Sequence, residues 1–428
     1  ECMGLTPSYI EVLQRQWMKD DISTLVNTYP DHEDLQGPAG YNIPEVMTNF
    51  LTEGGHCLTS EQQMTPILES AAAKLDCKLD KVGWIEPGLL TPDVLDRFPY
   101  AEHPNNIALV TEMGASLGIP RDFALKEMAD RVVPDLGVLK VYPVAGLSGR
   151  RLQFTNGFSA NERFGTLGNW RRLGFDRQDP ATEPGTWITA VVNNRADRIA
   201  RSQVFAGIVA QDISVDRLFL IGSNLKGLIG YIREAFQSRS RELTLFPDKG
   251  ESPQTILEKE ALRLRIPTCE EALSLSLDAM TGGDDSEKWR NPCIEAFQEY
   301  ETFARKIEQG GDHAALDREF RSLLWKWFSR KLIVISDYHA TGDQVIHRIA
   351  QETPPGYLNR IMGLQNIKGT GLDFVYRWQA WDTCHGACEK LTNRKLKVAR
   401  EGLVELAGFH DYGLLCAEHV IDSIDKAR

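Results

Sequence analysis

The chain has 428 residues, with 48 Lys and Arg against 60 Asp and Glu, and a formal charge of −12 at pH 7. Its length is sufficient for two or three domains, and its acidic balance excludes a nucleic-acid binder that works by neutralising phosphates. The eight cysteines lack the spacing of a disulfide framework, which predicts reduced thiols in a cytoplasmic protein. No apolar run approaches the length of a membrane span and no charged-then-apolar leader opens the sequence, so a soluble chain is expected.

The first predicted elements are a helix over residues 7–20 and a short buried strand over residues 22–26. The helix has apolar residues at roughly helical spacing, and the strand is rich in β-branched residues. Two further helices are predicted over residues 59–75 and 106–117. The second begins at Asn106, and an Asn in that position is most often an N-cap whose side chain accepts a hydrogen bond from the first turn.

A polar stretch over residues 27–37 directly follows the predicted strand. It places His32 beside Asp31, with Asp34 close by. Ligands of open α/β sheets bind at the carboxyl ends of strands, and a carboxylate beside a His fixes the imidazole tautomer for a metal. The stretch is therefore a candidate site for a divalent metal ion. The alternative is a solvated turn, which is the commoner outcome for an isolated Asp-His pair.

Residues 135–231 alternate between strand and helix patterns, which predicts a small parallel sheet with helices on its faces. The strands are expected over residues 138–144, 152–155, 186–192 and 218–221, and the helices over residues 165–173 and 198–210. Asn156 and Arg195 both fall where a strand ends and a helix is about to begin. Backbone amides and side chains at such a position point towards an anion.

The run from Arg195 through Asp197 to Arg198 has two interpretations. It is either a local ion-paired turn at the start of a helix or a clamp for an oxyanion, since a guanidinium binds carboxylates and phosphates through two parallel hydrogen bonds. The residues alone favour the ion-paired turn.

From residue 232 onwards the pattern is predicted to be mostly helical, with helices joined by Gly and Pro turns. The helices are expected over residues 231–236, 252–264, 270–280, 293–309, 314–332, 343–351, 357–364, 370–379 and 395–425. One of them carries a bulky apolar face formed by Phe320, Leu323, Leu324, Trp327 and Phe328. Such a face more often belongs to a domain core than to a partner groove.

Several of these stretches occur together, in the same order, in one family. The sequence resembles the poly-γ-glutamate synthases, the CapB/PgsB family of the Mur-ligase superfamily, over about residues 1–230. The motifs that carry the resemblance are Glu1-Cys2-Met3, the stretch over residues 27–37, the segment over residues 104–119, Asn156 to Asn161, and Arg195 to Arg198.

The resemblance implies an α/β protein with three parts. Residues 1–134 would be the remaining part of a Mur-ligase-like central nucleotide-binding domain, and residues 135–231 a small Rossmann-like carboxy-terminal ligase domain. Residues 232–428 would form a mostly α-helical extension whose role the sequence does not indicate.

The resemblance also implies an ATP-dependent amide ligase that adds glutamate to poly-γ-glutamate through an acyl phosphate. Glu1 and His32 would hold Mg²⁺, supported by Asp31 and Asp34. The nucleotide and the acyl phosphate would be bound and activated by two further sets of residues. The catalytic set is Arg195, Asn156 and Asn161, and the nucleotide-binding set is Asn27, Asn106, Asp197 and Arg198.

The sequence departs from the superfamily in three places. First, no G-x-x-x-x-G-K-[ST] phosphate-binding loop occurs in it. This absence predicts either that the sequence is a fragment of a longer enzyme or that a partner supplies the loop. In both cases the chain by itself is expected to show no measurable ATP hydrolysis. Ala160 stands where Mur ligases commonly have a His. No Lys occurs between His32 and Gly55, so a site with one metal ion fits better than a site with two.

Two other functions stay open at this stage. One is a related ligase, such as a folylpolyglutamate-like or cell-wall enzyme, and the other is a non-catalytic binding or scaffold protein. The partners implied by the resemblance are glutamate, the poly-γ-glutamate chain and membrane-embedded synthase subunits at the cytoplasmic face of the membrane. Nucleic acid is not expected, and the oligomeric state, including a homo-oligomer, is left open.

Overall fold

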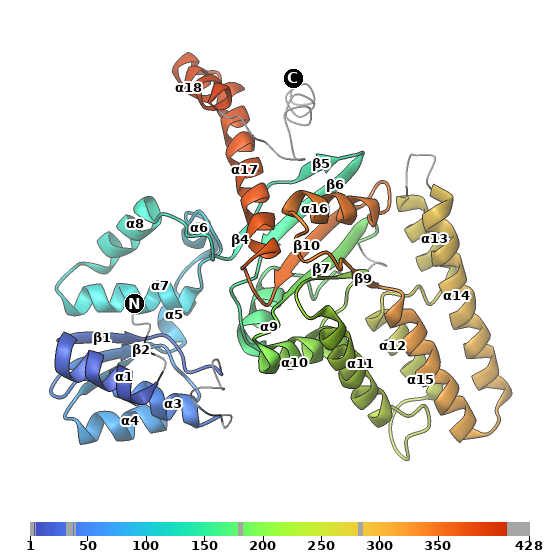
Figure 1. The fold of residues 1–428 in the computed structure, drawn as a ribbon, viewed down its shortest axis with the longest axis horizontal. Coiled ribbons are helices and arrows are strands. Elements are labelled where there is room, and N and C mark those ends of the chain that lie inside the picture. Colours follow the sequence, from blue (N-terminus) through green and yellow to red (C-terminus); the bar gives the residue numbers. More distant parts are fainter. Residues whose placement is uncertain are drawn as a thin grey trace. The chain divides into compact units, whose positions relative to one another are not determined.

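The computed structural model describes residues 4, 6–30, 37, 40–178, 183–280 and 286–408. The chain divides into two compact units, Glu1–Lys140 and Val141–Arg428 (Figure 1). Both units are built from parallel strands and helices, so the predicted α/β class is confirmed. The division falls near the boundary that was expected after residue 134.

The first unit is organised around three parallel strands in the order β1-β2-β3, namely β1 (Ile22–Leu25), β2 (His56–Thr59) and β3 (Lys78–Lys81). Successive residues of a strand point to opposite faces of the sheet. Cys57 accordingly packs with Leu68 of α4 (Thr65–Lys74), whereas Leu58 packs with Leu109 of α7 (Pro104–Ser116). Helices therefore cover both faces of this small sheet.

Of the elements expected in this unit, the strand after residue 21 and the helices around α4 and α7 are confirmed. The helix expected over residues 7–20 consists of α1 (Pro7–Glu11) and a π-helical segment, Val12–Met18. Strands β2 and β3 were not predicted. The other helices among the described residues of the unit are α3 (Asn42–Met47), a 3₁₀ turn (Thr48–Phe50), α5 (Ile85–Gly88), α6 (Pro92–Leu95) and α8 (Arg121–Arg131).

The second unit contains a seven-stranded sheet in the order β4-β6-β10-β7-β8-β9, with β5 paired to β6. Its strands are β4 (Lys140–Val141), β5 (Ala145–Leu147), β6 (Arg150–Asn156), β7 (Thr186–Asn194), β8 (Arg217–Gly222), β9 (Leu332–Val334) and β10 (Leu358–Leu364). Neighbours from β6 to β9 are parallel, and β5 is antiparallel to β6. The central strands β7 and β8 are buried along almost their whole length, as expected for a parallel sheet covered on both faces.

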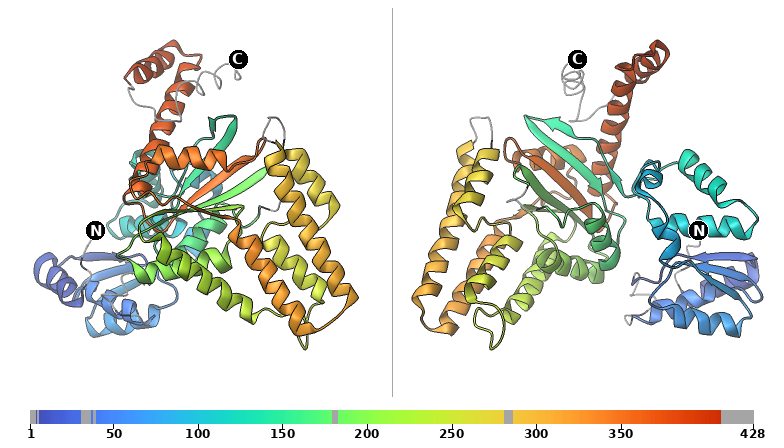
Figure 2. Two further views of the ribbon diagram at one scale, coloured as in Figure 1. Left: turned by 45° about the vertical axis from the view of Figure 1, so that its right-hand side comes forward. Right: turned by 180° about the vertical axis from the view of Figure 1, so that it is seen from behind.

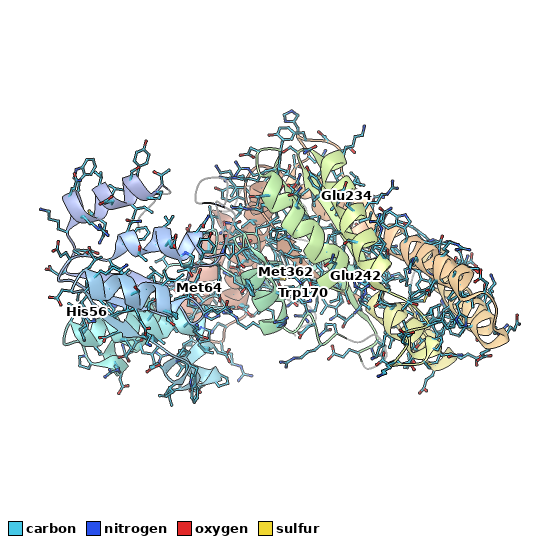
Figure 3. The ribbon with its side chains drawn as sticks, turned by 90° about the horizontal axis from the view of Figure 1, so that it is seen from below. His56, Met64, Trp170, Glu234, Glu242 and Met362 are labelled. Carbon is cyan, nitrogen blue, oxygen red and sulfur yellow. The ribbon has the colours of Figure 1, made fainter. Side chains whose placement is uncertain are left out.

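Two pairs of helices cover this sheet. Helix α10 (Ile199–Gly207), continued by a π-helical segment (Ile208–Asp212), packs on α11 (Leu225–Glu242), whose second half is marked by Glu234 and Glu242 in Figure 3. Helix α16 (Gly342–Gln351) packs on α17 (Thr370–Leu391). The chain crosses the sheet in one direction from β7 through β8 to β9 and in the opposite direction from β9 to β10. Because crossovers between parallel strands are right-handed, the pair α10 and α11 and the pair α16 and α17 lie on opposite faces of the sheet (Figure 2).

The prediction of a helix over residues 357–364 is wrong, because this segment is the strand β10. It lies between β6 and β7 at the centre of the sheet, with Ile361 opposite both Phe154 and Thr189. A short apolar run has no period that separates a buried strand from a buried helix, and only pairing with strands distant in the sequence decides its form. Residues 232–428 are therefore not a separate helical extension, since they supply β9 and β10 to the sheet.

The helical part of that region is an insertion between α11 and β9. It consists of α12 (Pro253–Arg263), α13 (Glu270–Ala279), α14 (Ser286–Gln309) and α15 (His313–Ser329), which lie beside the sheet (Figure 2). On α15, Phe320, Leu324, Trp327 and Phe328 are buried and Leu323 is half-buried, so the core interpretation of this face is confirmed.

The remaining helices of the second unit are α9 (Arg163–Arg172), which precedes β7, and α18 (Leu396–Ala407), which follows α17. The helix expected over residues 395–425 is described only as far as residue 408. Among the helices that the structure describes, none combines the length and apolar character needed to cross a bilayer.

Candidate active site

A pocket of about 850 Å³ lies at the carboxyl edge of the second unit's sheet. It is formed where β7 and β8 end and by the loops that follow β9 and β10. Its lining residues are Asn193, Asn194, Arg195, Ala196, Asp197, Gly222, Ser223, Tyr338, His339, Ala340, Thr341, Lys368, Gly369, Thr370, Asp373 and Arg377. This is the edge at which open α/β sheets bind their ligands.

The pocket has the electrostatic character of an anion site. Arg195, Lys368 and Arg377 line it together with two carboxylates, Asp197 and Asp373. In addition, α10, α11, α16 and α17 all begin beside it, because each follows the carboxyl end of one of these strands. The helix dipole places partial positive charge at these helix starts, which favours phosphate or carboxylate groups. At α16 the amides of Thr341, Gly342 and Gln344 already donate to side chains.

Buried amide side chains hold the strand ends around the pocket together. The Asn194 Oδ1 atom accepts hydrogen bonds from Ser202 Oγ at 2.7 Å and from Gln365 Nε2 at 2.8 Å, and its Nδ2 donates to the Ser223 carbonyl at 2.7 Å. Next to it, Asn193 Nδ2 donates to the carbonyl oxygens of residues 366 and 368 at 2.8 and 2.7 Å. These bonds join the ends of β7, β8 and β10.

Arg195 and Asp197 form an ion pair in this pocket. Arg195 Nε donates to Asp197 Oδ1 at 3.0 Å and Nη2 donates to Oδ2 at 2.6 Å, and Arg198 Nε lies 4.0 Å from the same carboxylate. The hydrogen bonds from Arg195 lower the pKa of Asp197. The ion-paired turn considered from the sequence is therefore present, and it leaves the Nη1 edge of Arg195 for other acceptors.

The structure does not bring Asn156 and Asn161 into the pocket of Arg195. Asn156 is the last residue of β6 and is buried, and Asn161 is half-buried in the segment before α9. Both Asn156 and Arg195 lie where a strand ends, as expected, but β10 lies between these two strands, β6 and β7. Neither Asn156 nor Asn161 is among the residues that line this pocket.

Sequence reasoning missed the part of the site that follows β9 and β10. Tyr338, His339 and Thr341 come from the segment between β9 and α16, and Lys368 and Arg377 follow β10. A signal was present, because the apolar run at residues 332–335 is followed by polar residues and by a Thr that caps a helix. A His that the sequence did not single out, His339, lines the pocket.

In the first unit, two of the predicted nucleotide-binding residues have local roles. Asn27 is exposed, and its Oδ1 accepts a hydrogen bond from the Tyr29 amide at 3.1 Å. The prediction that Asn106 caps its helix is wrong, because α7 begins at Pro104 and its N-cap is His103. The Asn106 side chain instead donates to Glu102 Oε1 at 2.8 Å.

Glu61 is a buried carboxylate at the carboxyl edge of the first unit's sheet that the sequence did not single out. Its oxygens accept hydrogen bonds from the Thr28 amide at 2.7 Å, the Gln63 amide at 2.7 Å and the Met64 amide at 3.0 Å. Burial opposes ionisation of Glu61, but these hydrogen bonds outweigh it and lower the pKa. The residue therefore ties the segment after β1 to the segment after β2.

The predicted metal ligands lie outside the described residues. These are Glu1 and His32, with Asp31 and Asp34 in support. Within the part of the chain that the structure describes, no group of three or more His, Cys, Asp or Glu residues is arranged to hold a metal ion.

The comparison with protein families finds a match within the second unit. Residues 141–272 match the family model described as the poly-gamma-glutamate synthase CapB C-terminal domain. This match covers β5 to β8 and the helices between them, and it includes the part of the pocket that carries Arg195 and Asp197. The resemblance inferred from the sequence motifs is confirmed.

Two curated relatives give the same result. The chain is 30% identical over 232 residues to PGA synthase CapB of Bacillus subtilis (strain 168), an alignment that covers 54% of this chain and 56% of that protein. It is 27% identical over 225 residues to the capsule biosynthesis protein CapB of Bacillus anthracis, covering 52% and 46%. The chain thus spans about half the length of the curated relatives it matches.

A solved structure with a more distant likeness is E. coli FolC in complex with DHPP and ADP. The match covers 84% of this chain and 61% of that chain, with 11% sequence identity and a TM-score of 0.41. A second is the bifunctional folylpolyglutamate synthase/dihydrofolate synthase of Yersinia pestis CO92, with 12% identity and a TM-score of 0.39 over 83% and 61% of the two chains.

Proposed function

We propose that this chain is part of an ATP-dependent amide ligase that lengthens poly-γ-glutamate. The observation that carries the proposal is the match of residues 141–272 to the CapB C-terminal domain. The cationic pocket at the carboxyl edge of the same unit supports it, because this reaction requires a site for phosphate and carboxylate groups.

The proposed reaction has two steps. The γ-phosphoryl group of ATP is transferred to the γ-carboxylate of the growing chain, which gives an acyl phosphate and ADP. The amine of the next glutamate then attacks the acyl carbon, so that a C–N bond forms, the C–O bond to phosphate breaks and inorganic phosphate leaves. Such chemistry depends on positioning the reactants and on neutralising the phosphate oxygens.

The residues that line the pocket fit this requirement. Of the three cationic side chains, Arg195 pairs with Asp197 and Arg377 pairs with Asp373 and Asp343, whereas Lys368 forms no ion pair with the described residues. In the proposal, Asp197 holds the guanidinium of Arg195 in place and Arg195 binds a phosphate or carboxylate oxygen through its remaining N–H groups. His339 lines the same pocket and is our candidate to accept the proton of the attacking amine.

Mg²⁺ would support the phosphoryl transfer by neutralising charge on the ATP oxygens. We retain Glu1 and His32 as its proposed protein ligands, with Asp31 and Asp34 in support, on the strength of the sequence motif alone. The proposed contacts of Asn27, Asn106, Asn156, Asn161 and Arg198 with the nucleotide or the acyl phosphate have the same basis. Membrane-embedded subunits at the cytoplasmic face remain the proposed partners.

The direct test is a ligation assay with the full-length protein. The protein is incubated with ATP, Mg²⁺, radiolabelled glutamate and a short poly-γ-glutamate primer. We expect release of ADP and phosphate that depends on glutamate, together with label incorporated into a product that γ-glutamyl hydrolase degrades. ADP release that depends on a folate or a cell-wall precursor in place of the poly-γ-glutamate primer would establish the related-ligase alternative. A folded protein without turnover of any of these acceptors would establish the scaffold alternative.

A further inference from the structure

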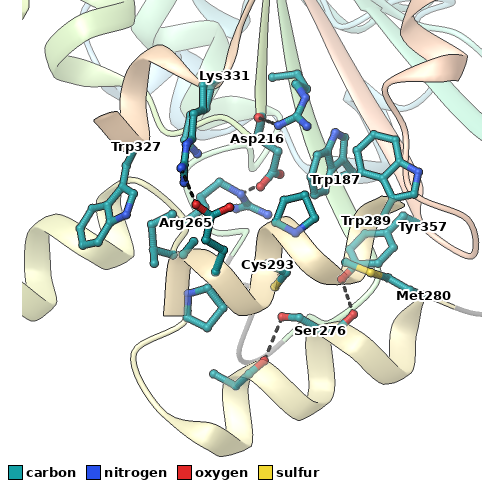
Figure 4. A pocket seen from close by; sticks show the side chains of 18 of the residues that line it. Trp187, Asp216, Arg265, Ser276, Met280, Trp289, Cys293, Trp327, Lys331 and Tyr357 are labelled. Carbon is teal, nitrogen blue, oxygen red and sulfur yellow. Dashed lines mark hydrogen bonds and ion pairs between the residues drawn. The ribbon is translucent and has the colours of Figure 1, made fainter. Parts of the chain in front are cut away.

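A second pocket, of about 430 Å³, lies at the opposite edge of the same sheet (Figure 4). It is bordered by the beginnings of four strands, since Trp187 lies on β7, Arg217 begins β8, and Lys331 and Tyr357 directly precede β9 and β10. Its other sides come from the helical insertion α12 to α15. The ligation chemistry proposed above makes no use of this cavity.

Aromatic and apolar side chains form one side of this pocket. The Trp187 ring meets the rings of Trp289 and Tyr357 edge to face, with centroid distances of 5.9 and 5.8 Å. Met280 and Cys293 pack against the same group, as Figure 4 shows. A cavity of this size and composition accommodates a planar or short aliphatic body.

The opposite side of the pocket is polar and buried. Lys331 is almost fully buried, and its Nζ donates to the carbonyl oxygens of residues 215 and 264 at 2.7 and 2.6 Å. Arg265 Nε pairs with Asp216 Oδ2 at 2.8 Å, and both side chains are less than one-tenth exposed. Burial lowers the pKa of Lys331 to about 7, so a neighbouring anion would stabilise its charged form.

One of the four cationic side chains that line the pocket has no carboxylate partner among the described residues. Arg265 pairs with Asp216 at 2.8 Å, Arg217 pairs with Glu352 at 3.2 Å, and Arg330 pairs with Glu295 at 2.8 Å and Glu299 at 3.2 Å. Lys331, in contrast, donates only to backbone carbonyl oxygens, and no carboxylate of the described residues forms an ion pair with it. A buried ammonium group without a counter-ion favours a ligand of opposite sign.

A buried hydrogen-bond donor also lines the pocket. The Nε1–H group of Trp187 is shielded from solvent and has no acceptor among the described residues. Leaving such a group without a partner costs about 1–3 kcal/mol, so an acceptor atom of a ligand would recover that free energy.

We propose that this pocket is a binding site for a small amphipathic monocarboxylate, with the apolar body against Trp187, Trp289 and Tyr357 and the carboxylate on the side of Lys331. The size of the cavity corresponds to an aryl or medium-chain alkyl acid. The site is separate from the proposed ligation pocket, because the two lie at opposite ends of the same strands.

Binding of 2-naphthoate to the purified protein tests this proposal, with isothermal titration calorimetry as the measurement. We expect one site per chain. We also expect an affinity at least tenfold higher than that of 2-naphthalenemethanol, which has the same body without the charge, or of acetate, which has the charge without the body. Equal affinity for the acid and the alcohol, or no binding of the acid at millimolar concentration, would overturn the proposal.

Three substitutions test the location of the site. Ala272→Trp fills the pocket from α13 and should abolish binding, whereas Ser274→Trp on the exposed side of the same helix should leave it unchanged. Trp187→Phe removes the buried donor and should weaken binding about fivefold while the protein still unfolds cooperatively. Unaltered binding by a folded Ala272→Trp variant would place the ligand elsewhere and overturn the assignment. Because binding is measured without ATP, the result does not depend on ligase activity.

Discussion

Arg195 illustrates how one residue can have a local and a functional role at once. Its pair with Asp197 is partly open to solvent, with side chains that are 25% and 60% exposed. An ion pair of this kind contributes only about 0–1 kcal/mol to stability. Its geometry matters more for the pocket, because the carboxylate fixes the plane of the guanidinium.

We therefore expect Arg195→Lys in the full-length protein to lower ligase turnover about a hundredfold, since Lys keeps the charge but loses the paired N–H donors. The melting temperature should change by no more than about 2 °C, because an exposed pair is worth so little. Glutamate-dependent ADP release and differential scanning fluorimetry measure the two effects. Arg163→Lys, which alters an exposed pair with Asp212 outside the pocket, is the control. A large loss of stability with intact turnover would leave Arg195 a purely structural role.

Substitution of Asn194, unlike Arg195→Lys, should lower the stability of the protein markedly, because the Asn194 side chain is buried and makes three hydrogen bonds at 2.7–2.8 Å. Asn194→Ala removes these bonds and leaves the buried side chains of Ser202 and Gln365 with one partner fewer. We expect the free energy of unfolding of the second unit to fall by roughly 2–3 kcal/mol. Urea denaturation followed by circular dichroism measures it. A change below about 0.5 kcal/mol would show that water or neighbouring groups replace the bonds.

Glu61 makes a pH-dependent contribution to the first unit. Its pKa in the folded state is below its ordinary value of 4.5, so the stabilisation is fully present above pH 4.5 and is lost as the pH falls through the folded pKa. We expect Glu61→Gln to lower the free energy of unfolding by roughly 2 kcal/mol at pH 7. The difference from the natural protein should shrink below pH 4.5.

Urea denaturation at a series of pH values tests this expectation. Glu53→Gln is the matched control, because Glu53 is an exposed carboxylate in the same unit. A difference that stays constant down to pH 3 would show that the effect of Glu61→Gln is not due to the charge.

Among the elements, β10 joins the two parts of the second unit's sheet, because it pairs with β6 on one side and β7 on the other. Its end packs tightly against the segment after β6. A Cβ atom on Gly363 would lie 2.6–2.8 Å from the ring of Phe158, and one on Gly157 would lie 2.7 Å from the Gly363 carbonyl oxygen. Both distances are below van der Waals contact, so the glycines permit this approach.

Gly363→Ala should therefore destabilise the protein by about 1–3 kcal/mol through overpacking. The matched control is Gly168→Ala on α9, where a Cβ atom would meet nothing within 4 Å. This control should stabilise the protein by up to about 1 kcal/mol, because Ala is a better helix former than Gly. Equal effects of the two substitutions on the melting temperature would contradict the packing argument.

At the scale of the whole molecule, the second unit depends on strands that lie far apart in the sequence. The family match ends at residue 272, before β9 and β10. A fragment limited to residues 141–272 would lack the strand that joins β6 to β7 and would leave their inner edges without hydrogen-bond partners.

We accordingly expect a fragment of residues 141–408 to unfold cooperatively and a fragment of residues 141–272 to lack a cooperative transition. Circular dichroism during thermal unfolding distinguishes them, and hydrogen exchange should show protection of β7 only in the longer fragment. A cooperative transition in the shorter fragment would contradict the essential role of β10.

The sequence by itself determined the α/β class, the elements from β6 to β8 and the turn that carries Arg195 and Asp197. These features depend on local periodicity and on residues that are close together in the chain, which a sequence displays directly. Only the tertiary structure decided that residues 358–364 form a strand, that β10 separates Asn156 from Arg195, and that His339, Lys368 and Arg377 join Arg195 in one pocket. The physical reason is that a parallel strand is stabilised by hydrogen bonds to strands that are distant in the sequence. These partners fix the position of the strand in the sheet, and that position decides which side chains meet at the carboxyl edge.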